Sequence, residues 1–167
     1  MPRSDQGAQR DRYQIIHRVL VFLTCPGKVL LIKGAPKKRL WANRYNGIGG
    51  HIERGEDVSS AAQRELAEET GIVGPNLRLV GTVMIDAGAE TGIGLYILHG
   101  QAEQQPVAQS PEGTAEWLPV AQLAEYPLVE DVRVLLAKIQ AMQPGDAPFS
   151  ARYFYDAQDQ LQITFSD

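Results

Sequence analysis

The chain has 167 residues, with 16 Lys and Arg against 20 Asp and Glu, which leaves a formal net charge of −4 at pH 7. This length fits one domain, and the mildly acidic balance argues against a nucleic-acid polymer as partner, because such partners usually need a basic protein face. Hydrophobic residues make up 44% and charged residues 22% of the chain, a composition that is typical of folded proteins and excludes global disorder.

The first predicted elements are a polar N-terminal arm and a β-hairpin. Residues 1–12 are polar and charged without periodicity, so we expect a flexible arm, followed by a single domain over 13–167. Apolar runs at 15–23 and 29–32 flank a Pro-Gly turn, and this pattern predicts two strands joined as a hairpin. The segment 34–43 mixes Gly, Pro and cations, which indicates an exposed loop.

A helix and further strands are predicted after a glycine-dense stretch at 46–52. Apolar residues recur at helical spacing over 58–66, Asp57 or Ser59 can cap the helix, and Gly71 stands where a helix stop belongs. The remaining expectations, in chain order, are strands at 77–85 and 92–99, a polar loop at 101–114, a strand at 117–120, a helical turn at 120–125, a helix at 129–142 and a terminal hairpin of strands at 152–155 and 161–165.

The order of these elements indicates the fold class. Strands and helices interleave without a regular βαβα alternation, so we expect an α+β sandwich. The only cysteine, Cys25, excludes an intrachain disulfide and a cysteine-based zinc site. The longest apolar runs, such as 19–23, fall far short of the ~20 residues that a membrane helix needs, and no signal peptide is recognisable. We therefore expect a cytoplasmic protein with no membrane partner.

Three glutamates share one face of the predicted helix. Glu65, Glu68 and Glu69 are spaced three and four apart, and like charges at that spacing repel by a few tenths of a kcal/mol per pair. Divalent cations such as Mg²⁺ prefer carboxylate oxygens, and one would relieve this repulsion. Arg64 is adjacent in sequence and can orient one of the glutamates. On the helix alone the alternative stays open that the acidic face is merely solvated.

The wider pattern decides between these two readings. It consists of Gly50, then Glu56 after five residues, then Arg64 after seven more, and it continues as Arg-Glu-Leu-Ala-Glu-Glu-Thr-Gly-Ile through Ile72. This pattern resembles the Nudix box, here at 50–72, of the Nudix hydrolases. The resemblance implies an α/β/α sandwich with a mixed β-sheet and a loop–helix–loop. It also implies Mg²⁺- or Mn²⁺-dependent hydrolysis of a nucleoside diphosphate linked to another group.

The resemblance also implies roles for the residues of the box. Glu65, Glu68 and Glu69 would bind the metal together with the carbonyl oxygen of Gly50. Glu65 and Glu69 would be the costliest to lose. Arg64 would act in catalysis by orienting a glutamate.

Other implied roles lie at the ends of the box and beyond it. Glu56 would support the loop through an ion pair with Arg64, and Gly71 would end the helix. Glu112, in the loop before the predicted strand at 117–120, would supply a further catalytic and metal-binding carboxylate. The alternative for Glu112 is a solvated loop residue.

The candidate substrate residues lie outside the box. The segment 44–50 resembles the oxidised-purine nucleoside triphosphatases related to MutT, and this resemblance implies that Asn46 binds the purine. Asn46 can alternatively serve only its own loop backbone. In the same relatives an acidic pair meets the base, which implies Asp131 here. Lys33 and Arg18 are the cations that we expect to meet phosphate.

The expected reaction converts a modified (d)NTP, such as 8-oxo-dGTP, to the monophosphate and pyrophosphate. A dinucleoside polyphosphate, a nucleotide sugar or ADP-ribose is the alternative substrate, and a nucleotide-sensing module without turnover is a third hypothesis. An isopentenyl-diphosphate isomerase would need a cysteine in the pocket, and Cys25 stands beside a turn. We expect a small nucleotide as the partner, and a monomer or homodimer.

Overall fold

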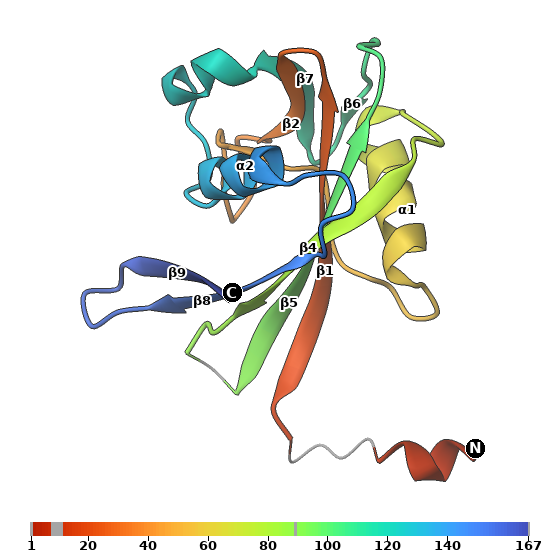
Figure 1. Ribbon diagram of the computed structural model, residues 1–167, viewed down its shortest axis with the longest axis vertical. Coiled ribbons are helices and arrows are strands. Elements are labelled where there is room, and N and C mark those ends of the chain that lie inside the picture. The colour runs from red at the N-terminus through yellow and green to blue at the C-terminus, as the bar shows by residue number, and fades with distance from the viewer. Residues whose placement is uncertain (1, 8–11, 89, 167) are drawn as a thin grey trace.

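The computed structural model describes residues 2–7, 12–88 and 90–166. Its described residues form one mixed β-sheet with a helix packed on each face (Figure 1). The elements are η1 (Arg3–Gln6), β1 (Gln14–Cys25), β2 (Lys28–Gly34), β3 (Tyr45–Asn46), α1 (Val58–Thr70), β4 (Leu77–Ile85), β5 (Thr91–Gln101), β6 (Gln109–Ser110), β7 (Gly113–Pro119), η2 (Val120–Glu125), α2 (Val132–Ala141), β8 (Phe149–Tyr155) and β9 (Leu161–Ser166).

The sheet has nine strands in the order β6-β7-β2-β1-β5-β4-β8-β9, and β3 pairs with β2 beside this path. The pairs β1–β5 and β4–β8 are parallel, and the other pairs of named strands are antiparallel. The predicted mixed sheet in an α/β/α sandwich is therefore confirmed. The predicted hairpin of β1 and β2 is confirmed as well, with Leu23 opposite Leu30.

Alternation along the central strands divides the core between the two faces. On β1, Val19, Val21 and Leu23 pack on the side of α1, while Leu20 and Phe22 pack on the side of α2. All five side chains are buried. This burial on both faces explains why the sequence there is a continuous apolar run rather than an alternating one.

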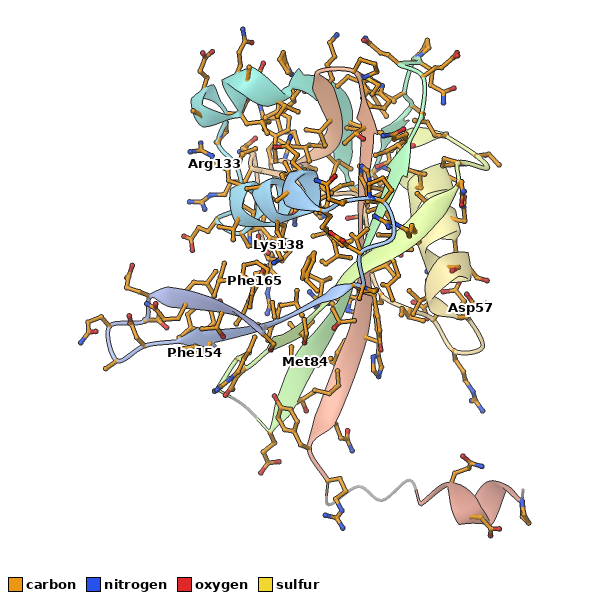
Figure 2. All side chains as sticks on the ribbon, in the orientation of Figure 1. Asp57, Met84, Arg133, Lys138, Phe154 and Phe165 are labelled. Atoms are coloured by element: carbon orange, nitrogen blue, oxygen red, sulfur yellow. The ribbon has the colours of Figure 1, made fainter. Side chains whose placement is uncertain are left out.

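The ends of α1 are determined by its own sequence. The side chain of Asp57 accepts a hydrogen bond from the backbone N–H of Ser60. Of the two candidate caps, Asp57 (labelled in Figure 2) rather than Ser59 therefore caps the helix. Gly71 ends the helix in the left-handed region at φ 76° and donates its N–H to Ala67. Leu66 is fully buried against the sheet.

The segment 48–52, which contains the first residue of the box, pairs with β1. Val21 and Ile48 exchange backbone hydrogen bonds of 2.7 and 3.1 Å, and the N–H of Val19 bonds to the carbonyl of Gly50 at 2.9 Å. A Cβ on Gly49 would overlap the carbonyl oxygen of Val19. Only glycine therefore allows this close approach, which brings the segment within reach of α1.

Several expected boundaries differ from the structure. The loop expected at 101–114 contains β6 and the start of β7. The last helix begins at Val132 rather than Val129, because residues 128–129 pair with Tyr45 of β3 in the manner of a strand. Residues 1 and 8–11 of the expected arm lie outside the described residues, and η1 is a short 3₁₀ helix within the rest. No helix in the described ranges is long and apolar enough to cross a membrane.

Candidate active site

The three glutamates of α1 are buried to different depths. Glu69 is 4% exposed, whereas the side chains of Glu65 and Glu68 are 13% and 59% exposed. The predicted acidic face therefore runs from the interior to solvent, rather than lying on the surface throughout. A buried carboxylate needs a compensating partner, and this excludes the solvated alternative for Glu69.

Arg64 joins the acidic residues of the box. It binds Glu56 through two hydrogen bonds, Nε to Oε1 at 2.6 Å and Nη2 to Oε2 at 2.9 Å. It also donates to Glu65 at 2.8 Å, to Glu68 at 3.1 Å and to the carbonyl of His51 at 3.0 Å. The predicted ion pair of Arg64 with Glu56 is thus confirmed.

The fork of Arg64 also explains the protonation behaviour of its main partner. The hydrogen bonds of Glu56 to Arg64, and to the backbone N–H of Glu53, lower the pKa of Glu56 to about 2. The carboxylates in turn raise the pKa of Arg64. Glu56 and Arg64 are therefore both charged at neutral pH, and the guanidinium of Arg64 holds Glu65 in one orientation.

Glu69 has a different environment, without a guanidinium. Its Oε2 accepts a hydrogen bond from the backbone N–H of Gly49 at 3.1 Å. Burial, followed by the charges of Glu65 and Glu112, raises the pKa of Glu69 to about 7, against the lowering effects of Gly49 and Lys38. A carboxylate with this pKa sits near the midpoint of its titration at neutral pH, which is typical of functional sites.

Gly50 allows Glu65 to approach the backbone. A Cβ on Gly50 would lie 2.5 Å from Oε1 of Glu65, so a larger residue would displace the carboxylate. Among the residues that the structure describes, the carbonyl of Gly50 accepts one hydrogen bond, from Val19, and a carbonyl oxygen can accept a second partner. Its proposed role as a metal ligand stays a prediction.

Glu112 comes to the same place from the distant loop before β7. Its carbonyl accepts the N–H of Ala35 at 3.0 Å, and its carboxylate pairs with Lys38 at 2.5 Å. Its charge also acts on Glu69. Sequence reasoning selected Glu112 but missed Lys38, whose only signal was the cationic run 37–39 within a loop expected to be exposed.

The ligand atoms at this site are of the kind that a hard divalent cation prefers. The available ligands are carboxylate and carbonyl oxygens, and the buried Glu69 has two acidic neighbours, which is the charge arrangement that a cation would balance. In the conformation of the structure, no three His, Cys, Asp or Glu side chains of the described ranges converge on one point. Glu65 and Glu68 bond to Arg64 instead.

The other predicted site residues do not join the carboxylates. Alternation places Lys33 and Arg18 on the face of α2, opposite to α1, because their neighbours Leu31 and Leu20 pack there. The Lys33 ammonium lies 5.7 Å from the ring centroid of Tyr45. The Nε atom of Arg18 is buried and has no hydrogen-bond partner within the described residues.

The two residues predicted to bind the base, Asn46 and Asp131, lie on β3 and directly before α2. Asn46, on β3, accepts the N–H of Gly47 at 2.8 Å through its side-chain oxygen, so its amide group partly serves its own backbone. Asp131 precedes α2, and burial raises its pKa. The neighbouring Tyr153 is 2% exposed, and burial and then Asp131 raise its pKa.

An aromatic pair near Asp131 was not anticipated from the sequence. The rings of Tyr45 and Tyr126 meet edge to face, 5.5 Å apart at an angle of 86°, and the hydroxyl of Tyr45 donates to Glu116 at 3.0 Å. The backbone of Tyr45 bonds to Pro127. Tyr126 lies two residues before Leu128, and its ring was the only signal in the sequence for this pair.

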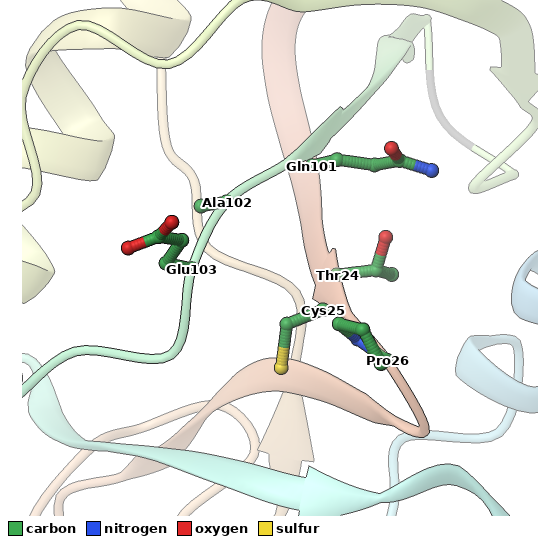
Figure 3. A pocket seen from close by; sticks show the side chains of 6 residues that line it. All are labelled: Thr24, Cys25, Pro26, Gln101, Ala102 and Glu103. Carbon is green, nitrogen blue, oxygen red and sulfur yellow. The ribbon is translucent and has the colours of Figure 1, made fainter.

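The single cysteine lies away from the carboxylates. Cys25 is in a pocket at the end of β1 whose lining is shown in Figure 3. Gly50 bonds to Val19, in the middle of that strand. At ~3.3 Å per residue, Cys25 and Val19 are about 20 Å apart. The carboxylate site therefore has no nucleophilic cysteine within the residues that the structure describes.

The sequence was compared with family models and with known proteins. The sequence matches the family model described as the NUDIX domain over residues 16–139. An oxidized purine nucleoside triphosphate hydrolase of Danio rerio is 32% identical over 102 residues, which are 60% of this chain and 64% of that protein. An isopentenyl-diphosphate Delta-isomerase of Rhodobacter capsulatus is 34% identical over 99 residues, which are 57% of this chain and 52% of that protein. The match thus spans less than two thirds of the length of either relative.

A solved structure supports the fold. The crystal structure of the MutT protein from Bacillus halodurans has a TM-score of 0.74 and 21% identity, and the match covers 91% of this chain and 98% of that chain. At this identity the likeness shows the architecture alone. The family model covers most of the chain and includes the whole carboxylate site, and on this ground the chain belongs to the NUDIX domain family.

Proposed function

We propose that this protein is a metal-dependent pyrophosphohydrolase of modified (d)NTPs, such as 8-oxo-dGTP, with the monophosphate and pyrophosphate as products. The observation that carries the proposal is the buried Glu69, which is bonded to Gly49 and adjoined by Glu65 and Glu112. Such an acidic cluster beside glycine backbone suits a reaction in which a polyphosphate and cations meet.

The metal would be Mg²⁺ or Mn²⁺. Glu65, Glu68, Glu69 and Glu112 would hold it with the carbonyl oxygen of Gly50. When bound, the ion would neutralise charge on the phosphates and lower the pKa of a bound water. Glu65, Glu69, Glu112 and Arg64 are the proposed catalytic residues.

The chain's own residues prepare this reaction. The hydrogen bond from Arg64 restricts rotation of the Glu65 side chain, and Glu56 in turn fixes the position of Arg64. The N–H of Gly49 fixes one oxygen of Glu69, and a bound ion would keep that carboxylate deprotonated. Gly71 ends the helix and so fixes where the acidic face stops.

The base and phosphates would be recognised outside the carboxylate cluster. The side-chain oxygen of Asn46 is engaged by Gly47, and its amide NH₂ group, which has no hydrogen-bond partner among the described residues, would donate to a purine. Asp131, with a raised pKa, can serve as acceptor or donor depending on its protonation. Arg18 and Lys33 stay the proposed cations for phosphate, and they would contact it from the face of the sheet that carries α2.

The choice of substrate rests on the Danio rerio relative, whose name is an oxidized purine nucleoside triphosphate hydrolase. The alternatives with the same chemistry are a dinucleoside polyphosphate, a nucleotide sugar or ADP-ribose. A sensing module is disfavoured because the acidic residues of the box are all present. An isomerase activity, as named for the Rhodobacter capsulatus relative, is disfavoured by the distance of Cys25 from the site. We further propose a cytoplasmic monomer or homodimer that acts on free nucleotides, without nucleic-acid or membrane partners.

A substrate screen tests the proposal. The protein is incubated with Mg²⁺ and 8-oxo-dGTP, dGTP, diadenosine tetraphosphate, ADP-ribose or UDP-glucose, and the products are identified by chromatography. Fastest hydrolysis of 8-oxo-dGTP with release of pyrophosphate supports the proposal. Preference for another compound moves the assignment to that substrate class, and release of orthophosphate alone from the triphosphates contradicts pyrophosphohydrolysis.

A further inference from the structure

The cation beside the carboxylates comes from the loop between β2 and β3, residues 35–44. The loop is closed at its base by backbone bonds of Gly34 with Arg44 at 3.0 Å and with Asn43 at 2.9 Å. It is joined to the opposite wall of the site by the bond from Ala35 to the carbonyl of Glu112. The loop thus has an anchored base and an exposed tip.

Lys38 is the one side chain of this tip that reaches the site among the described residues. Its ammonium pairs with Glu112 at 2.5 Å, and both side chains keep solvent contact, with 38% and 53% exposure. The neighbouring Lys37 and Arg39 form no ion pair within the described ranges and are exposed. The contact is therefore particular to Lys38 and not a general effect of a basic loop.

Two carboxylates of the site lack a contact with Arg64 and are the ones on which Lys38 acts. Arg64 engages Glu56, Glu65 and Glu68, so Glu112 and the buried Glu69 are the carboxylates that it does not reach. The charge of Lys38 acts on Glu69 as well, in opposition to burial. Lys38 therefore balances the two acidic groups that Arg64 leaves unbalanced.

We infer that Lys38 is an exchangeable counter-ion of the carboxylate site, which competes with divalent cations for Glu112 and Glu69 and couples the loop 35–44 to metal occupancy. This inference rests on the metal site of the proposed function. An exposed ammonium on a flexible stem can leave with little cost, because solvent screens such pairs and their net stabilisation is small. Once released, the ammonium stays at the rim of the site on an anchored loop, where a polyphosphate would be its next anionic partner.

Metal affinity without nucleotide is the decisive measurement, since it does not depend on which substrate the protein hydrolyses. Mn²⁺ binding is followed by electron paramagnetic resonance of the free ion, at low ionic strength, for wild type, K38M, K38R and K37M. We expect K38M to bind Mn²⁺ about two- to fivefold more tightly, which is the range for loss of one exposed ion pair. K38R retains the charge and should match wild type. K37M removes the same charge one residue away and should change the affinity much less.

A double-mutant cycle with E112Q separates local competition from a general change in charge. In the E112Q background, K38M should gain little affinity, because the carboxylate for which Lys38 competes has lost its charge. Equal or weaker Mn²⁺ binding by K38M than by wild type overturns the counter-ion role alone, as does an equal gain in K37M. Failure of wild type to bind Mn²⁺ or Mg²⁺ at all overturns the metal site, and with it both this inference and the proposed function.

Discussion

Arg64 is the residue that compensates two of the three neighbouring glutamates on α1, Glu65 and Glu68. Like charges at this spacing weaken a helix, and the planar fork of arginine offers five donors in fixed directions. Here those donors are shared among Glu56, Glu65 and Glu68 and the carbonyl of His51. Glu69 receives none of them, so it depends on the Gly49 amide and on the charge of Lys38.

The substitution E69Q tests the role of this buried carboxylate. Glutamine fills the same volume but removes a negative ligand, so we expect a rate loss of at least ~10²-fold with an unchanged fold. Activity and far-ultraviolet circular dichroism are measured together, with E103Q at an exposed position as the control. Near-normal turnover by E69Q would contradict the metal-site assignment.

The substitution N46A tests purine recognition. If the amide NH₂ group of Asn46 donates to a purine, its loss should raise KM more for purine than for pyrimidine triphosphates. The difference between the two classes should be roughly ten- to hundredfold, which is what one hydrogen bond to a buried partner can supply. Steady-state kinetics on both classes measure this split. The bond from Gly47 would be lost in either case, so an equal effect on both classes would reduce Asn46 to support of the loop.

At the scale of elements, the loop before α1 and the helix itself are linked by charge and by caps. Glu56 bonds to the N–H of Glu53 within the loop and to Arg64 on the helix, and Asp57 then caps the first turn. Consecutive residues thus tie the same loop to two different turns of α1. The position of Glu65 is therefore set by the loop as much as by the helix.

Acid should loosen this link. The pKa of Glu56 is lowered to about 2 from its ordinary 4.5, so its contribution to stability is fully present above the ordinary value and is lost as the pH falls towards 2. We expect wild type to be more stable than E56Q at pH 7, with the difference shrinking between pH 4.5 and 2. Urea unfolding across this range measures it, and E103Q should show no such pH-dependent difference. A constant difference would mean that Glu56 acts through packing.

At the scale of the whole molecule, periodicity and the box predicted most of the framework. The continuous apolar run of β1, the spacing in α1 and the terminal hairpin each have a local signal that the structure confirms. The Arg64–Glu56 pair followed from the family pattern. Strands of two residues, β3 and β6, are too short to show any period.

The unpredicted parts of the site depend on tertiary structure. Lys38 and Glu112 are distant in sequence, and they meet only because the loop after β2 is anchored to the segment before β7. The pairing of Tyr45 with Tyr126 likewise needs the chain after η2 to return to β3. Such meetings are set by how the elements pack, and no local pattern encodes them.

The segment 48–52 carries a consequence for motion. Since it is hydrogen-bonded to the central strand through Val19, Val21 and Ile48, these amide protons should exchange with deuterium only when the whole protein unfolds. Exchange measured by nuclear magnetic resonance would then be as slow there as at Leu30 in β2, and much faster at the tip of the loop around Lys38. Fast exchange at Val19 or Ile48 would refute this. This side of the carboxylate site would thus be as rigid as the core, and any motion of the site would fall to the loop around Lys38.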